Sequence, residues 1–564
     1  MKLTLFLLLL LASCLLWTAT FTAAATRSRR FGTGLLLAGV VVPLVVLLPL
    51  LAITAWLAFG PFRIADNRLL PVAATTLSAI AGGIWIVASG RRPAGLAGAG
   101  AARRWPVVPL AALAASAAIG TAATIAHLER QSALEAVAWY AEGAAIMESN
   151  QLPPVPATVN AAALYRQAES LLEDDPDYRH DGWDDDPDVG SRQAGEFLAR
   201  HAGALDLIRH ATDRDICRFD GDWARSSSLS PPAEGKMLRH HSRLLALAAL
   251  RAAREGRPED AIADVLRMRR LAGHAMEMER VVGRISAANL VERACHTLAS
   301  VCSELQPADL PLLDDARLAE AFAPLPPLIR PILEEEAWGL AVFAAVATHR
   351  LTLGEIDGGY ANIPRDDAPA AAFLGMLYRA FLIRSDLERF RAQLRRVERV
   401  AADVDSGTSR WEDVVRSLLP VDDRIDQGIL NQALWCAWGP VLGHHAKVDA
   451  TIGATRVAVA ATRHRLKTGH LPDSLDDLVP EELPFPPRDP FTTSQPLRLR
   501  KMDQGIVVWW VGQDGEDDGG PSTKTYADFG TDGNDDLGLW VGPDDFGRPP
   551  ERSAPQPADG AGPA

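Results

Sequence analysis

Residues 256–262 read Gly-Arg-Pro-Glu-Asp-Ala-Ile, and this stretch decides the fold of the middle of the chain. The residues before it, about Glu234–Glu255, have the pattern of one long helix, and Gly256 is a typical residue at which a helix ends. Pro258 is favoured in the first turn of a helix, so a second helix is predicted to begin there and to run towards His274. Two long helices joined by so short a turn are expected to pack against each other as a hairpin.

The same stretch resembles the turn of a tetratricopeptide repeat, where small residues let paired helices pack closely. The period of roughly 34 residues that such repeats have is not evident in this chain. We therefore predict a helical-hairpin array, similar to tetratricopeptide repeats but without a strict repeat, over residues 131–446. Further helices are expected at Ser132–Glu148, Asn160–Glu173 with Thr158 as its N-cap, Ile332–Leu351, Ala370–Val404 and Arg424–Lys467.

The composition favours helix over sheet. Of the 564 residues, 48% are hydrophobic but only 6% are aromatic, because Ala and Leu dominate, and both are good helix formers. Arginine accounts for 51 of the 57 basic residues, which, with the high alanine content, indicates a GC-rich bacterial genome. The composition excludes a collagen-like, a disulfide-dense and a wholly disordered protein. The predicted fold class is therefore mainly α.

Charge is divided unevenly along the chain. Residues 1–130 contain eleven basic and two acidic residues, a net charge of +9, although the whole chain carries −14. The other 434 residues therefore carry −23. Nucleic-acid binding depends on clustered positive charge, so this acidic body argues against nucleic acid as a partner.

Four apolar stretches without a charged residue lie within residues 1–130. Each has about the 20 residues that a helix needs to cross a hydrocarbon core of about 30 Å. They are about Leu3–Ala25, Gly34–Gly60, Leu69–Ser89 and Pro106–Ala126. We predict a four-helix transmembrane region, so the membrane is one expected partner.

The first apolar stretch has two further interpretations. Ala23–Ala25 offers a cleavage site for a signal peptide, and Leu11–Cys14 has the pattern of a lipoprotein signal. The apolar run continues through Leu15, Leu16 and Trp17, beyond the point where processing would end it. An uncleaved helix is therefore the interpretation that we favour.

Arginines in the short loops indicate the orientation in the membrane, because positively charged loops stay in the cytoplasm. The opposite side holds four basic residues, whereas the loops after the first and third spans hold seven, namely Arg27, Arg29, Arg30, Arg91, Arg92, Arg103 and Arg104. Both termini and the acidic body are then extracytoplasmic. The predicted location is a bacterial inner (cytoplasmic) membrane, which the chain crosses several times.

Familiar catalytic motifs do not occur in the sequence. His-Glu-x-x-His, Gly-x-Ser-x-Gly, the P-loop and the dinucleotide fingerprint are all missing, so we predict no catalytic residue, cofactor-binding residue or small-molecule substrate. Two acidic groups could serve a metal-dependent hydrolase, Asp184–Asp188 and Glu334–Glu336. The first lies in a run of nine acidic residues among sixteen, Glu173–Asp188, and both groups are better explained as solvated charge.

Histidines and cysteines give no clear metal pattern. His240-His241 and His444-His445 are adjacent pairs, whose side chains point about 100° apart on a helix, so we expect surface or interhelical residues. Buried thiols are the expected state of the cysteines outside the spans, although an oxidising compartment would permit two disulfides. These cysteines are Cys217, Cys295, Cys302 and Cys436.

A small α+β module is predicted over residues 447–547. It begins with a helix whose apolar stripe runs from Val448 to Leu466 and which Gly469 ends. The segments expected after it are a helical turn at Ser474–Leu478, a hairpin of strands 497–500 and 506–511, a strand at Leu537–Val541 and a disordered tail over 548–564.

Short motifs in this module occur in a particular order. They are Gly469-His470-Leu471-Pro472, Ser474-Leu475 with Leu478, Asp489-Pro490-Phe491 with Pro496, Gly512-Gln513-Asp514-Gly515, Gly519-Gly520, Asp536 and Trp540. In this order, over about residues 447–541, they resemble the C-terminal domain of type II secretion major pseudopilins. Thr492 stands where that family usually has Gly, and the family has one N-terminal apolar helix rather than four spans. The whole chain looks like a multi-span bacterial envelope protein that reuses this module.

The resemblance implies a calcium site in the acidic loop that follows the hairpin. Calcium prefers hard oxygen ligands, and glycines allow the tight backbone around it. A solvated acidic turn is the alternative. The candidate ligands are Asp514, Asp517, Asp518, Asp535 and Asp536.

Three functions follow from these expectations. The first is a membrane-anchored extracytoplasmic scaffold or interaction protein that binds another protein and has a calcium-stabilised C-terminal module. The second is a component of a type II secretion or pilus-like apparatus. The third, a metal-dependent hydrolase, has the least support from the sequence.

Overall fold

The chain divides into two compact units. Unit 1 comprises Met1–Ala144, Gly339–Gln393 and Pro420–Trp435, and unit 2 comprises Ala145–Trp338, Leu394–Leu419 and Cys436–Ala564. The computed structural model describes residues 107–150, 155–156, 158–173, 192–219, 233–278, 280–314, 316–357, 369–406, 414, 428–434, 438–492, 495–512, 515–521 and 536–542.

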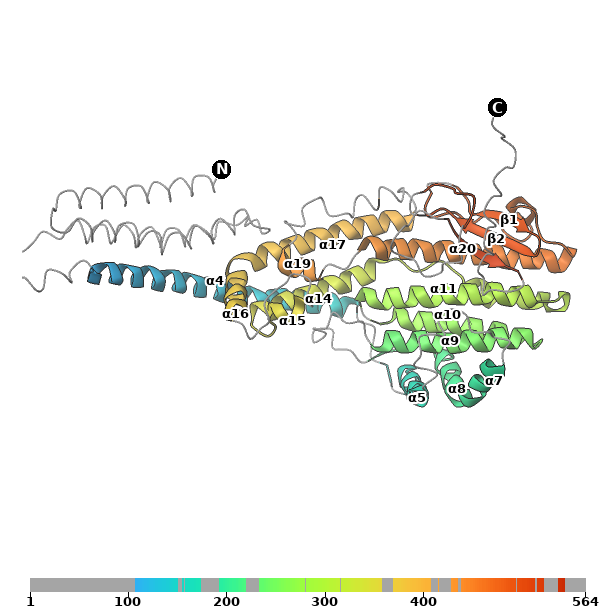
Figure 1. The fold of residues 1–564 in the computed structure, drawn as a ribbon, viewed down its shortest axis with the longest axis horizontal. Helices are drawn as coiled ribbons and strands as arrows, with labels where there is room; N and C mark the ends of the chain where they lie inside the picture. The colour runs from blue at the N-terminus through green and yellow to red at the C-terminus, as the bar shows by residue number, and fades with distance from the viewer. Residues whose placement is uncertain are drawn as a thin grey trace, which may run out of the picture. The chain divides into compact units, whose positions relative to one another are not determined.

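The centre of unit 2 is a layer of three long helices. They are α9 (Ala233–Arg254), α10 (Pro258–Met276) and α11 (Arg280–Glu304), and they lie side by side in Figure 1. Gly256 has a φ of +71°, which glycine adopts more readily than other residues, and Pro258 is the first residue of α10. The predicted helical hairpin is confirmed, and the structure is mainly helical.

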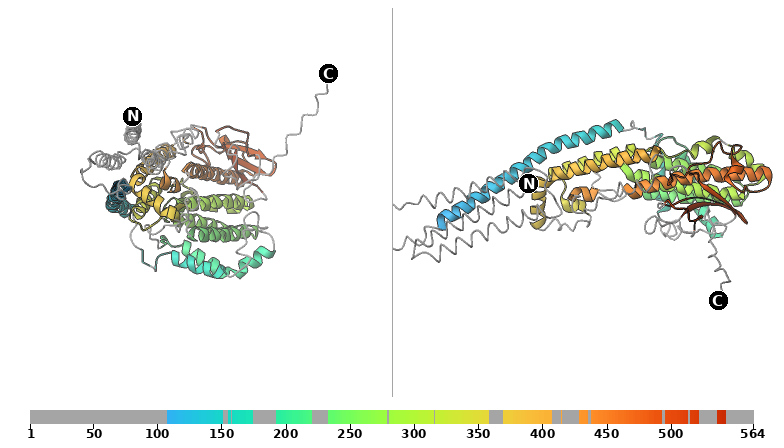
Figure 2. Two further views of the ribbon diagram at one scale, coloured as in Figure 1. Left: turned by 60° about the vertical axis from the view of Figure 1, so that its left-hand side comes forward. Right: turned by 90° about the horizontal axis from the view of Figure 1, so that it is seen from above.

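Further helices cover both sides of this layer. The helices α5 (Ala162–Leu172), α7 (Arg192–Arg200) and α8 (Ala202–Thr212) pack on one side, and α20 (Trp438–Thr468) packs against α11 on the other. The same order of layers is visible in Figure 2 as the colour passes from cyan through green to orange. Arg465 of α20 donates hydrogen bonds to the carbonyls of Cys302 and Leu305, so it satisfies acceptors at the C-terminal end of α11.

An ion pair holds the outer helix α8 to the layer. The buried carboxylate of Asp264 on α10 accepts two hydrogen bonds from Arg209 of α8, at 3.0 and 2.6 Å.

The predicted N-cap Thr158 is wrong, because the N-cap of α5 is Ala161. The nearby polar anchor is Asn160, whose side-chain oxygen accepts from the amides of Ala162 and Arg218 and so joins two distant segments.

Short helices connect α11 to the rest of the chain. They are η2 (Pro307–Asp309), α12 (Leu310–Leu313) and α13 (Ala316–Ala321), followed by the longer α14 (Ile329–Ala347), whose first half belongs to unit 2. The predicted helix over Arg424–Lys467 is described as two helices, α19 (Ile429–Leu434) and α20, and the residues between them lie outside the described part.

A small antiparallel sheet follows α20 in the chain. The helical turn η5 (Leu475–Leu478) has Ser474 and Asp477 in a capping box, and the strands β1 (Arg498–Met502), β2 (Gly505–Trp510) and β3 (Leu537–Val541) come after it. Strand β2 is central and pairs with β1 and β3, and the two-residue turn Asp503-Gln504 joins β1 to β2. Strand β2 is buried along its length, and β3 packs on α11 and α20. The predicted hairpin and last strand are confirmed.

Unit 1 contains two helices that ion pairs hold together. They are α4 (Val107–Asn150) and α17 (Ile383–Ser406), and both continue into unit 2. Glu135–Arg384 and Glu142–Arg391 join these two helices, and Glu129 of α4 pairs at 2.8 Å with Arg379, in the turn just before α17. The predicted helix over Ser132–Glu148 is therefore only the second half of a longer helix.

A buried aspartate, Asp386, lies in the first turn of α17. A π-helical turn, η3 (Tyr378–Leu382), joins α16 (Pro369–Leu377) to α17 and brings the Tyr378 hydroxyl to 2.6 Å from Asp386. Asp386 also accepts from the amides of Leu430 and Asn431, at the start of α19 (Ile429–Leu434), near the short α15 (Leu353–Asp357). Burial raises the pKa of Asp386 to about 6, although these hydrogen bonds favour its charged form.

The first three predicted spans and the predicted tail over 548–564 lie outside the described residues. The fourth predicted span, about residues 106–126, falls in the first half of α4. Among the helices of the described residues, none has the length and apolar character needed to cross a membrane. The four-helix transmembrane region therefore stays a prediction from the sequence.

Candidate functional site

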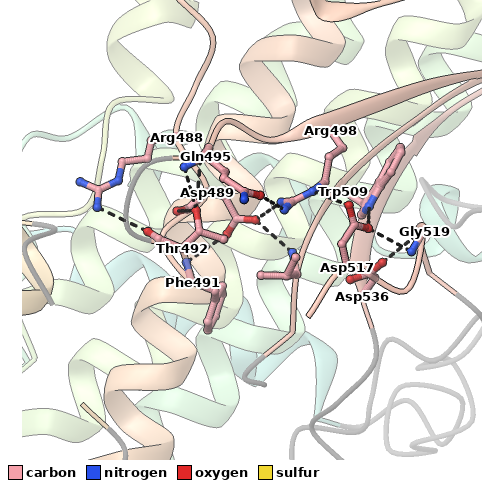
Figure 3. Close-up of polar contacts among 12 residues, drawn as sticks. Arg488, Asp489, Phe491, Thr492, Gln495, Arg498, Trp509, Asp517, Gly519 and Asp536 are labelled. Atoms are coloured by element: carbon pink, nitrogen blue, oxygen red, sulfur yellow. Dashed lines mark hydrogen bonds and ion pairs between the residues drawn. The ribbon is translucent and has the colours of Figure 1, made fainter. Parts of the chain in front are cut away.

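The candidate site lies where the acidic loop that follows β2 meets the turn before β1. Figure 3 shows its side chains, which come from the Asp489 turn, from β1 and β2, and from the segments around Asp517 and Asp536. All of them belong to unit 2.

Asp489 is the buried centre of this network. Its carboxylate is fully buried and accepts hydrogen bonds from the amides of Phe491 and Val511, each at 3.0 Å, and from the guanidinium of Arg498 (Figure 3). Burial raises the pKa of Asp489, and the hydrogen bonds and the arginine counteract that effect. The Asp489 side chain therefore ties its own turn to β1 and to the end of β2.

Arg498 extends the network to the acidic loop. Its Nε lies 3.0 Å from Oδ2 of Asp517, so one guanidinium joins two carboxylates (Figure 3). The other oxygen of Asp517 accepts from the amide of Gly519 at 2.9 Å and from the indole N–H of Trp509 at 3.3 Å. Burial disfavours the charged form of Asp517, but these contacts together lower its pKa. Asp517 is thus an ionised group with both oxygens engaged.

Among the predicted ligands that the structure describes, Asp536 has the surroundings that most disfavour its negative charge. It is 2% exposed, and its Oδ2 accepts from the amide of Gly520 at 2.6 Å, whereas Oδ1 is buried and has no hydrogen-bond partner in the described part of the chain. Burial, and then the negative charges of Asp517 and Asp518, raise the pKa of Asp536 to about 6. A cation beside Oδ1 would stabilise the ionised carboxylate and so oppose that shift.

The predicted calcium ligands are therefore brought together only in part. Asp517, Asp518 and Asp536 lie close enough for their charges to interact, whereas Asp514 and Asp535 lie outside the described residues. Within the described part of the chain, no three His, Cys, Asp or Glu side chains are arranged to hold a metal ion. The buried Oδ1 of Asp536 fits a hard cation, and Asp517 fits it less well because Arg498 already occupies one of its oxygens.

Sequence reasoning missed two important residues of this site, Arg498 and Trp509. Both lie on predicted strands, where alternate side chains are expected to face solvent or core. An arginine on a strand beside a predicted acidic loop is a signal that could have identified Arg498. Asp489 entered only as part of a motif, and its burial was not predicted.

The other candidate groups are structural in the described residues. Glu334 and Glu335 are buried rather than solvated, which corrects the prediction of surface charge: Arg330 pairs with Glu334 at 2.8 Å, and Glu335 accepts from the amide of Val281. His241 is fully buried between helices, 3.1 Å from Glu169. Asp184–Asp188 lies outside the described residues.

The described cysteines are free and buried. They are Cys217, Cys295 and Cys302, and burial raises the pKa of each thiol to about 12. Thiols with such pKa values are unreactive at neutral pH, so the expectation of buried thiols is confirmed for these three. Cys436 lies outside the described residues.

Comparison with known proteins gave no relative: no family model, no curated protein and no solved structure matches the chain.

Proposed function

We propose that this protein is a membrane-anchored extracytoplasmic scaffold or interaction protein. The observation that supports this most is the stack of α9, α10, α11 and α20, with a small sheet packed at α11 and α20. Stacked helical hairpins present extended surfaces that commonly bind other proteins. The anchor is proposed from the four uncharged apolar stretches of residues 1–130, and the extracytoplasmic side from their loop arginines.

Crosslinking in native membranes tests the proposed scaffold. A photoreactive amino acid placed at exposed positions of α9 and α10 should repeatedly capture the same protein partner. A matched probe in the exposed Asp503 turn should not capture that partner. Repeated experiments that recover no reproducible partner from the helical stack would count against a scaffold.

Calcium at the acidic loops is the second part of the proposal. It is supported by the resemblance to pseudopilins and by the buried, unpartnered Oδ1 of Asp536. The carboxylates of Asp536 and Asp518 would supply oxygen ligands, and the bound ion would hold the segment before β3 against the loop that follows β2. The amide of Gly520, which donates a hydrogen bond to Oδ2 of Asp536, would hold this carboxylate in place for the ion.

The expected result of adding calcium to the full-length protein is slower amide exchange in β3 and at Gly519-Gly520. At a free calcium concentration 100 times the Kd, the gain in stability would be about 2.7 kcal/mol. The effect should be larger at pH 7.5 than at pH 5. Asp536 has a raised folded-state pKa of about 6, so at pH 5 calcium must displace its proton.

A pair of matched variants makes this measurement specific. Asp536→Asn should abolish the calcium effect, whereas Asp503→Asn, an exposed aspartate in the β1–β2 turn, should retain it. Hydrogen exchange followed by mass spectrometry gives the readout. Equal exchange with calcium and with EDTA in the folded wild-type protein would reduce the loop to a solvated acidic turn.

A second candidate is a component of a type II secretion or pilus-like apparatus. The order of a long helix, a hairpin, an acidic loop and a last strand supports it, together with the resemblance. Co-purification with secretion proteins is the expected result. Normal secretion by a strain that lacks the gene would argue against this role.

A further inference from the structure

Helices α9 and α11 lie side by side and point in the same direction, because each is joined by a short turn to α10. Their relative register is set near their N-terminal ends. Gly235 of α9 lies so close to α11 that an added Cβ would come within 2.9 Å of the Ser286 hydroxyl. Residues that follow Gly235 on α9 therefore lie level with those that follow Ser286 on α11.

Three cations follow this close contact. Arg239 lies four residues after Gly235, and Arg293 lies seven residues after Ser286, so the two differ by about 4.5 Å along parallel axes. Lys236 lies nearly one turn before Arg239, and both are exposed, whereas Arg293 is half-buried. Burial lowers the pKa of Arg293, the negative charge of Glu292 raises it, and the positive charge of Arg239 lowers it, so both charges act on this guanidinium.

The neighbouring acidic groups are engaged elsewhere. Glu292 pairs with Lys447 at 2.7 Å, Glu234 lies 3.9 Å from Arg166, and Glu169 faces His240 and His241. Within the described part of the chain, Lys236, Arg239 and Arg293 form no ion pair, although the charge of the adjacent Glu292 acts on Arg293. The exposed Lys236 and Arg239 therefore present positive charge on α9, in a chain with 71 acidic and 57 basic residues.

We propose that Lys236, Arg239 and Arg293 form a docking surface for an acidic segment of a partner protein. Guanidinium groups bind carboxylates through paired hydrogen bonds, so two adjacent arginines suit a segment with spaced Asp or Glu side chains. The negative charge of the body does not prevent this, because charges beyond the Debye length of about 8 Å are largely screened at physiological ionic strength. The inference rests on the proposed interaction function and adds the chemistry of the partner.

A fluorescein-labelled peptide of alternating Glu and Gly tests the docking surface on full-length protein in detergent. The wild-type protein should bind it, and added salt should weaken the binding. The double variant Lys236→Gln/Arg239→Gln should bind about tenfold more weakly, because charged hydrogen bonds are lost. Arg254→Gln removes an exposed cation from the other end of α9 and should leave the affinity within about twofold of the wild type.

Several outcomes would overturn the proposal. They are no binding of the Glu-Gly peptide by folded wild-type protein, equal binding by the double variant, and preference for inorganic phosphate or phosphatidylglycerol vesicles over the peptide. Both altered side chains are exposed, and a thermal melt confirms that the variant is folded. If crosslinking still recovers the same partner from the double variant, this docking surface is wrong but the scaffold function stands.

Discussion

Replacing Lys447 by methionine is expected to lower the free energy of unfolding of unit 2 by about 3–5 kcal/mol. The ammonium group of Lys447 on α20 lies 2.7 Å from the carboxylate of Glu292 on α11, and both side chains are buried. Burial disfavours the charged form of Glu292, yet Lys447, His444 and His296 together lower its pKa, so the carboxylate is ionised. Without the ammonium group, that charge remains buried beside α20 and lacks its ion-pair partner.

The matched control for Lys447 is Lys467→Met. Lys467 also pairs with a glutamate, Glu482, but that carboxylate keeps a second partner in Arg463 at 3.1 Å, so the loss should stay below about 1 kcal/mol. Urea unfolding of the full-length protein, followed by pulse proteolysis, compares the variants. The double variant Glu292→Leu/Lys447→Met should recover most of the stability, because apolar residues can replace a buried pair without loss. Equal stability of Lys447→Met and the wild type would show that the pair contributes little.

Local patterns predicted much of the fold. Gly256 and Pro258 marked a real helical turn, and the sequence pattern placed the last strand at Leu537–Val541, as the structure has it. Such signals depend on residues within a few positions of one another. Such local signals therefore predict reliably that a helix or a hairpin is present.

The candidate site was less predictable, because its contacts join residues that are distant in the sequence. The three consecutive glutamates at Glu334–Glu336 have the pattern of a solvated helix face, but a neighbouring helix supplies the amide of Val281 to one of them. Arg498 likewise becomes part of the site only because folding brings Asp489 and Asp517 to either side of it. A pattern within one element does not contain this information.

Arg498→Met is expected to destabilise the C-terminal module by about 3–5 kcal/mol at neutral pH. The variant removes the only cation that joins the buried Asp489 to Asp517 among the described residues. Asp489 keeps the amides of Phe491 and Val511, but its charge is then buried without a counter-ion. Amide exchange in β2 and β3 of the full-length protein measures the loss.

Acidification should partly rescue this variant. The pKa of Asp489 is already raised by burial, and loss of Arg498 raises it further. A carboxyl group with a raised folded-state pKa takes up a proton more readily in the folded than in the unfolded protein, so stability falls as pH rises through that pKa. The variant should therefore be closer to the wild type at pH 5 than at pH 7.5.

Arg500→Met is the matched control on the same strand. Arg500 stacks on Trp509 with its guanidinium carbon 5.3 Å from the ring centroid, and it donates to the carbonyl of Gly519 at 2.9 Å. Its removal leaves no buried carboxylate without a partner, so the loss should be about 1 kcal/mol and independent of pH over this range. Equal losses in the two variants would mean that Arg498 acts by packing alone. A larger, pH-dependent loss for Arg498→Met would mean that the charge of its guanidinium holds the acidic loop against the buried Asp489.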